Sequence, residues 1–124
     1  MWKKIKFTIL GNPSGKGRPR FSARTGHAHT PGNTVIYENL VRTEYRIQCN
    51  GFMFDEDAML DMRILAFYEM PKSTSKKKRE LMLNGMLRPT KKPDMDNVVK
   101  VIADSLNKVA YRDDTQIVAC QCRK

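Results

Sequence analysis

Five aspartates are concentrated near the carboxyl end of this 124-residue chain, at Asp94, Asp96, Asp104, Asp113 and Asp114. Carboxylate oxygens suit hard divalent cations, and Mg²⁺ typically takes one or two of them and keeps several waters that a phosphate can replace. The chain as a whole is basic, with 23 Lys and Arg against 13 Asp and Glu and a formal net charge of +10. A local concentration of acid in such a chain indicates a Mg²⁺ site, with Mn²⁺ as the natural substitute.

A helix must carry part of this acidic set. Pro93 disfavours the helical region for Lys92, so the helix is predicted to begin after it, with Asp94 or Asp96 as the N-cap. Asp96, Lys100 and Asp104 are four residues apart and stack on one face of such a helix. A separate apolar face is predicted to meet the core, and it consists of Val98, Val99, Ile102, Ala103 and Leu106.

The acidic face also has a purely structural interpretation. An N-cap followed by i,i+4 ion pairs at Asp96, Lys100 and Asp104 contributes about 0.2–0.5 kcal/mol per pair on a surface helix. This alternative leaves Asp94 and the later pair Asp113 and Asp114 without a role. Both interpretations stay open from the residues alone.

Two sequence segments carry a resemblance to a known family. KPDMDNVVKVIADSLN at residues 92–107 and YRDDTQIV at residues 111–118 resemble the signature of the RusA-type Holliday junction resolvases, small endodeoxyribonucleases common in prophages. GNPSGKGRPRF at residues 11–21, together with Thr30 and Pro31, is similar to the opening of that family. Together these matches cover most of the chain.

The resemblance implies a Mg²⁺-dependent, structure-selective endodeoxyribonuclease. Its members resolve four-way junctions and other branched DNA by paired phosphodiester hydrolysis, in DNA recombination and repair. It implies Asp94, Asp96 and Asp114 as essential carboxylates and metal ligands, with Lys100 as the essential basic side chain. Asp104 and Asp113 are further candidate metal ligands. It also implies a single RusA-like domain over residues 1–124, without the final C-terminal strand of that family.

The basic residues predict where DNA would bind. No acidic residue precedes Glu38, and the segment after Gly11 is not a nucleotide-binding P-loop, because it has three residues where four are needed before Gly15 and Lys16. Guanidinium groups suit bidentate phosphate contacts. The predicted DNA-binding residues are Lys16, Arg18, Arg20, Lys76, Lys77, Lys78, Arg79, Lys91 and Lys92. Composition alone also fits a non-catalytic nucleic-acid-binding module, a ribosomal protein or a protein of the membrane surface.

The number of cysteines and the hydropathy of the chain indicate the cellular compartment in which the protein is expected. Three cysteines are an odd number, so reduced thiols are favoured over a disulfide framework. Neither a signal peptide nor a run of 18 apolar residues is visible, so a cytoplasmic protein without a membrane partner is expected. His27 and His29 lack the spacing of a zinc motif.

The elements that position these residues are predicted from periodicity. Alternation predicts strands over residues 3–10 and 58–70, the second covered on both faces at its end, and an interior strand over residues 116–122. Helices are predicted over residues 34–50 and from Ser73 or Thr74 to Asn84 and Gly85. This order predicts an α+β fold, a small mixed or mainly antiparallel sheet with helices packed mainly on one face, as in RusA.

The expected substrate predicts a homodimer. A four-way junction has near two-fold symmetry and needs two opposed nicks, whereas the chain carries one acidic constellation. Two chains related by a two-fold axis would place two active sites on symmetry-related strands.

Overall fold

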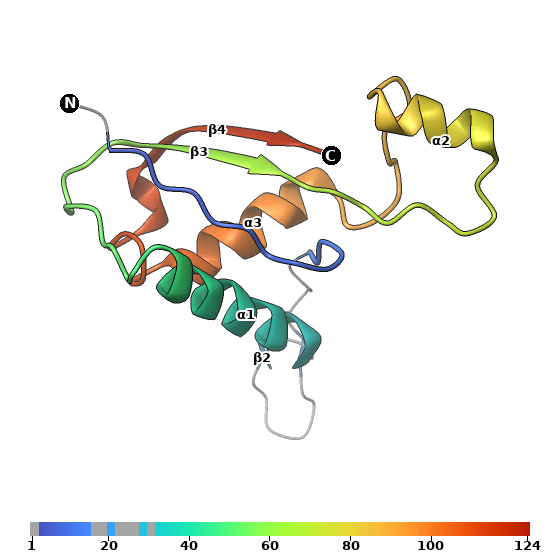
Figure 1. Ribbon diagram of the computed structural model, residues 1–124. Helices are drawn as coiled ribbons and strands as arrows, with labels where there is room; N and C mark the ends of the chain where they lie inside the picture. The colour runs from blue at the N-terminus through green and yellow to red at the C-terminus, as the bar shows by residue number, and fades with distance from the viewer. Residues whose placement is uncertain (1–2, 16–19, 22–27, 30–31) are drawn as a thin grey trace.

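The computed structural model describes residues 3–15, 20–21, 28–29 and 32–124, and in the two short stretches only the backbone. Three helices and two pairs of strands make it an α+β fold, which confirms the predicted class (Figure 1). No helix in these ranges is long and apolar enough to cross a membrane. In chain order the elements are β1 (Arg20–Phe21), β2 (Ala28–His29), α1 (Gly32–Gln48), β3 (Leu60–Leu65), α2 (Lys76–Leu83), α3 (Met95–Leu106), the 3-10 helix η1 (Asp114–Gln116) and β4 (Ile117–Arg123).

The sheet that positions α3 consists of β3 and β4, which run parallel from the pair Leu60 and Ile117 to the pair Leu65 and Arg123. β1 and β2 form a separate antiparallel pair. Helices α1 and α3 lie on the same side of the β3–β4 sheet, with α3 between the sheet and α1 (Figure 1). The expected placement of helices mainly on one face is therefore observed.

Helix α3 is buried over a wider arc than its periodicity predicted. Val98, Ala103 and Leu106 are buried as expected, but Val101 and Ser105 are also completely buried. The reason is the position of α3 between two layers, which covers flanks that a surface helix would leave in solvent. The Ser105 hydroxyl is satisfied inside its own helix by the Val101 carbonyl, so this polar side chain does not enter the core without a partner.

The core joins α1 to the loop that follows α3. Val41 and Tyr45 of α1 pack with Leu106, Ala110 and Tyr111. The Tyr45 hydroxyl donates to the Phe52 carbonyl and the Tyr111 hydroxyl donates to the Ala103 carbonyl at 2.6 Å. Both phenols are thus buried with their polar ends paired, as large amphipathic side chains require.

The strand predicted over residues 3–10 is an extended segment that pairs with no strand among the described residues. Its alternation is real, because Ile5, Phe7 and Ile9 pack against the core. Its backbone is paired by a side chain instead of a neighbouring strand: the Thr8 N–H donates to Gln48 Oε1 at 2.8 Å, and Gln48 Nε2 donates to the Thr8 carbonyl at 2.6 Å. The predicted alternation of buried and exposed residues is correct, but the described residues do not make this segment a strand of a sheet.

Both later strands are more exposed than predicted. The ladder of β3 ends at Leu65, and Leu65 and Phe67 are 66% and 78% exposed, so the end of the predicted strand is not covered on both faces. β4 has β3 as its one neighbour in the described part of the chain and is largely exposed, so it is not an interior strand there. The register between β3 and β4 shifts after Leu60, so Val118 has no partner in β3. A strict alternation of sides along β4 ignores this bulge, and it therefore predicts apolar residues on both faces of the strand.

Helix boundaries differ from the predictions by one or two residues. α1 begins at Gly32 and ends at Gln48, and α2 is capped by Ser75, whose hydroxyl accepts from the Lys78 N–H at 3.3 Å. Gly85 ends α2 with φ +80°, as its glycine predicted. α2 stands away from the rest of the fold and has no buried residue (Figure 1).

Candidate metal and DNA-binding site

The structure divides the five aspartates between the two ends of α3. Asp94 and Asp96, here called the amino-terminal pair, lie at its start. Asp94 has the extended backbone of an N-cap, yet its carboxylate makes no capping hydrogen bond. Asp96 is exposed in the first turn. The structural interpretation of Asp94 as a cap therefore explains its backbone but not its side chain, which remains open to a ligand.

Asp104, Asp113 and Asp114, here called the carboxyl-terminal trio, gather where the loop after α3 returns. Burial raises the pKa of Asp114, a hydrogen bond and the negative charge of Asp113 raise it further, and the charge of Asp104 adds to this. A hydrogen bond from the Asn107 side chain opposes the shift in pKa. The same three carboxylates also raise the pKa of the buried Tyr111 phenol, after desolvation as the main cause. These side chains form one electrostatic cluster.

The amino-terminal pair and the carboxyl-terminal trio lie apart from each other. Asp96 and Asp104 are about 12 Å apart along the helix axis, at 1.5 Å per residue. Within the described ranges, no group of three or more Asp, Glu, His or Cys side chains is arranged as a ready metal cage. Asp94, Asp96 and Asp114, which the resemblance joins in one site, are therefore divided between the two ends.

Lys100 lies between Asp96 and Asp104, on the same face of α3. Its ammonium is 3.5 Å from the Asp104 carboxylate, with the lysine side chain 60% exposed, and no ion pair links it to Asp96. Such an exposed pair contributes only about 0.3–0.5 kcal/mol. The i,i+4 interpretation thus holds for one of the two possible pairs, and the lysine remains accessible to a phosphate.

Gln116 fixes the loop that carries Asp113 and Asp114. Its Oε1 accepts from the backbone N–H groups of Arg112 and Asp113 at 3.0 and 3.3 Å. Its Nε2 donates to the carbonyls of Asp55 and Ala58 at 2.9 and 3.2 Å. One side chain therefore ties the acidic loop to the segment before β3. Gln116, the glutamine of the Asp113-Asp114-Thr115-Gln116 sequence (the DD-x-Q element), thus positions the two aspartates.

Two contacts fix the start of α3. The Tyr68 hydroxyl donates to the Pro93 carbonyl at 2.7 Å. Burial raises the pKa of this phenol, and the charges of Cys122 and Asp94 raise it further. From the other side Gly15 packs so closely that a Cβ built on it would lie 2.7 Å from Pro93 Cβ and 3.0 Å from Asn97 Cβ. The glycine before Lys16 thus lies directly beside the amino-terminal pair.

Asn12 holds the segment that contains Gly15 against the stretch of chain that follows β3. Its Oδ1 accepts from the Glu69 N–H at 3.0 Å and its Nδ2 donates to the Glu69 carboxylate at 3.2 Å. Sequence reasoning did not find the roles of Asn12 and Tyr68, because their partners are 57 and 25 residues away in the chain. Asn107 and Gln116 were visible as parts of the two signature segments, but no local spacing indicated what they contact.

The predicted DNA-binding residues fall into three classes. Lys76, Lys77 and Lys78 are exposed in the first turn of α2, and Lys92 is exposed before α3. Arg79 and Lys91 are engaged in the fold, since Arg79 Nε donates to the Thr74 carbonyl and Lys91 Nζ to the Glu69 carbonyl. Lys16 and Arg18 lie outside the described residues, as does the side chain of Arg20.

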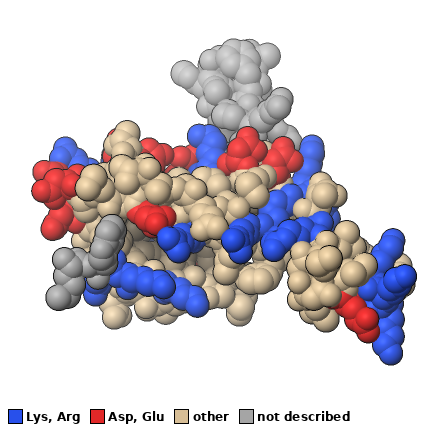
Figure 2. Space-filling view, turned by 90° about the horizontal axis from the view of Figure 1, so that it is seen from above, with Lys and Arg blue, Asp and Glu red and all other residues tan. Residues whose placement is uncertain are grey.

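The charge distribution extends beyond these residues. On the face seen from above the sheet, Lys and Arg side chains form a band across the centre toward α2, while acidic side chains gather along one edge (Figure 2). Basic and acidic surfaces therefore adjoin each other. This arrangement suits a polyanion that is held by cations while one of its phosphates reaches the acidic groups.

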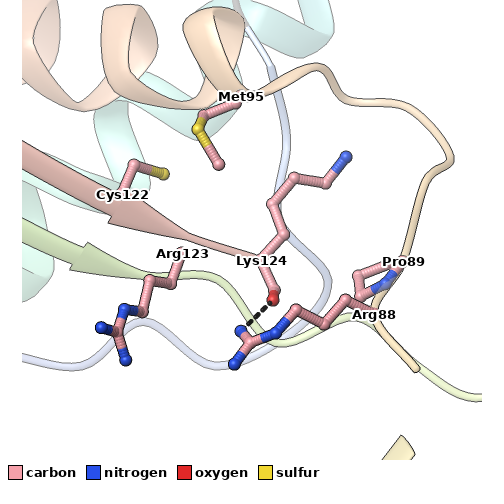
Figure 3. Close-up of a pocket in the computed structure, with 6 residues that line it drawn as sticks. All are labelled: Arg88, Pro89, Met95, Cys122, Arg123 and Lys124. Carbon is pink, nitrogen blue, oxygen red and sulfur yellow. Dashed lines mark hydrogen bonds between the residues drawn. The ribbon is translucent and has the colours of Figure 1, made fainter. Parts of the chain in front are cut away.

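An open cleft of about 490 Å³ lies beside the start of α3 (Figure 3). Arg88 donates to the Lys124 carbonyl at 3.1 Å, and Cys122 points toward Met95 while Arg123 points away from it. The Lys124 ammonium lies 5.1 Å from the centre of the Tyr68 ring and donates to the Lys91 carbonyl. The lining residues are Arg88, Pro89, Met95, Cys122, Arg123 and Lys124.

Comparison with known proteins decides the family. A match to the family Endodeoxyribonuclease RusA covers residues 11–124. The chain belongs to the RusA endodeoxyribonuclease family. This confirms the resemblance carried by residues 92–107 and 111–118, and membership of the family supports endodeoxyribonuclease activity on Holliday junctions. A curated relative, the uncharacterized protein YqaN of Bacillus subtilis (strain 168), is 39% identical over 97% of this chain and 86% of its own length. Comparison with solved structures gave no match.

Proposed function

We propose that this RusA family member is a Mg²⁺-dependent, structure-selective endonuclease that resolves four-way junctions and other branched DNA by paired nicks, in recombination and repair. One observation carries the proposal: Lys100 is exposed between two groups of carboxylates on the solvent-facing side of α3. The carboxylates of Asp94 and Asp96 are not used for capping or ion pairing within the described residues. Chemistry is the role that remains for them.

The donor set fits a hard divalent cation. All five acidic side chains offer oxygen ligands, and Mg²⁺ needs only one or two carboxylates, since waters and substrate phosphates complete its shell. The amino-terminal pair and the carboxyl-terminal trio each meet that requirement. We assign Asp94, Asp96 and Asp114 as the principal metal ligands, with Asp104 and Asp113 as further ligands. Mn²⁺ is expected to substitute for Mg²⁺ because it favours the same oxygen donors.

A bound cation would lower the pKa of a water to make a nucleophile and offset charge on the reacting phosphate. The residues of the chain do the rest. Lys100 would neutralise charge on the scissile phosphate or on the leaving oxygen, because its ammonium is exposed one turn from Asp96 and one turn from Asp104. Gln116 and Tyr68 would keep the loop of Asp113 and Asp114 and the start of α3 in place.

The basic surfaces would hold the DNA arms. Lys76, Lys77, Lys78 and Lys92 are exposed and free to meet phosphates, and Lys16, Arg18 and Arg20 follow Gly15, which packs beside the amino-terminal pair. Arg79 and Lys91 would contribute charge from their anchored positions.

Paired nicks require two active sites, so the proposed working unit is a homodimer. β4 supports it, since one of its edges is unpaired in the described part of the chain and an open edge favours pairing with another chain.

The experiment is a cleavage assay on a four-way junction and on a linear duplex of the same sequence, with Mg²⁺ and with a chelator. Selective, Mg²⁺-dependent nicking of the junction in two opposed strands supports the proposal. Mixing wild-type with Asp96→Asn subunits should convert paired cuts into single nicks, and light scattering should give twice the mass of one chain. Junction binding without cleavage under all conditions would favour the non-catalytic binding module, for which the Lys100 and Asp104 ion pair is the supporting observation.

A further inference from the structure

The open cleft beside the start of α3 has an apolar side and a cationic side (Figure 3). Cys122 points toward Met95 on the apolar side, and Met95 is 46% exposed although it is a large apolar residue. The guanidinium groups of Arg88 and Arg123 lie on the other side in this view. Three of the six lining residues are cationic and none of the six is acidic. The proposed function assigns no role to this cleft.

Both arginines keep hydrogen-bond donors for a ligand. Within the described residues, neither of them forms an ion pair with a carboxylate. Arg88 uses one N–H group on the Lys124 carbonyl at 3.1 Å, and the Arg123 side chain bonds to no described residue. A guanidinium presents five donors in a planar fork that matches a phosphate. The cleft is therefore equipped to hold a phosphate.

The cleft is connected to the start of α3. The ammonium of Lys124, which lines the cleft, lies 5.1 Å from the centre of the Tyr68 ring. The Tyr68 hydroxyl in turn donates to the Pro93 carbonyl. Met95 lies between the two aspartates of the amino-terminal pair in the chain. A ligand that contacts Met95 therefore adjoins that pair.

We infer that this cleft holds one unstacked nucleotide of the DNA strand that is cut, with its phosphate on Arg88 and Arg123 and its base against Met95 and Pro89. The volume of about 490 Å³ suits such a ligand, since sites for small molecules span about 300–1,000 Å³. Taking a base out of the stack costs least where pairing is already disrupted, so a branch point supplies this nucleotide more easily than a linear duplex does. The inference rests on the proposed function for DNA as the ligand, and it gives a physical reason for selecting branched DNA.

The test follows DNA binding with a chelator present, so that no strand is cut. 2-Aminopurine, whose fluorescence rises when it leaves the base stack, is placed at the branch point of a four-way junction or, as a control, within one arm. The wild-type protein should raise the emission of the branch-point probe alone. Met95→Ala should reduce this rise to less than about half at saturating protein, because apolar surface that would cover the base is lost. Ile47→Ala, which truncates an exposed apolar side chain of α1, should leave the rise unchanged.

The phosphate contacts are tested by affinity. Arg88→Gln with Arg123→Gln should weaken junction binding about tenfold or more, because charge-assisted hydrogen bonds to the phosphate are lost. The control, Lys4→Gln with Arg46→Gln, removes the same charge from exposed positions outside the cleft. The two double variants should bind a linear duplex equally. If the double arginine variant does not fold, Arg123→Gln alone decides, since this side chain bonds to no described residue.

Two results overturn the inference. One is a branch-point probe whose emission does not change when the wild-type protein is bound, and the other is equal junction affinity of the arginine variant and its charge-matched control. Emission that rises with the wild-type protein and falls with Met95→Ala supports the inference even when Mg²⁺ gives no cleavage, and that combination would contradict the proposed nuclease alone. Cleavage of the junction without a rise in emission would contradict the role of the cleft and leave the nuclease intact.

Discussion

Gly15 and Pro93 are packed so closely that the Cβ of any other residue at position 15 would lie 2.7 Å from Pro93 Cβ. Gly15→Ala should therefore displace the start of α3 and lower the free energy of unfolding by about 1–3 kcal/mol, as overpacking does. Thermal or denaturant unfolding measures this. Gly32→Ala is the matched control, because a Cβ there would meet nothing within 4 Å. Equal stability of the two variants would contradict the close contact.

The chemistry assigned to α3 predicts separate effects on cutting and binding. Asp96→Asn should reduce cleavage of a four-way junction about 100-fold or more, because it removes a ligand charge. Junction affinity should be unchanged or higher, since the substitution also removes repulsion of a phosphate. Single-turnover cleavage and a gel-shift titration measure the two quantities. Undiminished cutting would remove Asp96 from the metal site.

Lys100→Ala should reduce the rate of cleavage by about 10²–10³-fold, the range for loss of one preorganised charge-stabilising group. Affinity for the junction and melting temperature should change little, because the pair with Asp104 is exposed and contributes only about 0.3–0.5 kcal/mol. A clear drop in melting temperature with full activity would instead assign Lys100 to the structural ion pair.

Gln116 should contribute to cleavage by holding the loop of Asp113 and Asp114 in place. Gln116→Leu removes two acceptor and two donor contacts at once. Losing them should lower the free energy of unfolding by about 1–3 kcal/mol and slow cleavage at every Mg²⁺ concentration. Gln121→Leu, an exposed glutamine on the adjacent β4, serves as the control. Equal stability of the two leucine variants would show that the loop holds its shape without Gln116.

The lysines of α2 should contribute to affinity through counterion release. Lys76→Gln with Lys77→Gln should weaken binding to any DNA sequence and reduce the log–log salt dependence by about two, one for each lost phosphate contact. Lys4→Gln with Lys6→Gln removes the same charge from the exposed side of the extended amino-terminal segment. The prediction fails if both double variants change the slope equally, since net charge alone would then explain it.

The sequence predicted which face of each element is buried better than it predicted what covers that face. Ile5, Phe7 and Ile9 alternate toward the core as expected, yet the partner of their backbone is the side chain of Gln48. Periodicity cannot reveal this, because a half-buried extended segment has the same pattern with or without a strand beside it. Val101 and Ser105 were missed for a related reason, since their burial depends on two layers meeting α3.

The candidate site was predicted in its composition and only in part in its arrangement. The residue types and the four-residue steps gave Asp96, Lys100 and Asp104 on one face, as observed. The grouping of Asp114 with Asp104, away from Asp94 and Asp96, depends on how the loop after α3 returns, and that path is fixed by Gln116 and by contacts far away in the chain. Such long-range contacts leave no local pattern in the sequence.

If the lysines of α2 bind DNA as proposed, this helix separates recognition from folding. An eight-residue helix that buries no side chain contributes nothing to the core, so substitutions on its surface change the affinity for a partner without disturbing what lies beneath. Residues of the body, in contrast, serve packing and chemistry together. On the proposed binding role, preference among DNA substrates could diverge through α2 at little cost in stability, and this helix would be the place to engineer a new specificity.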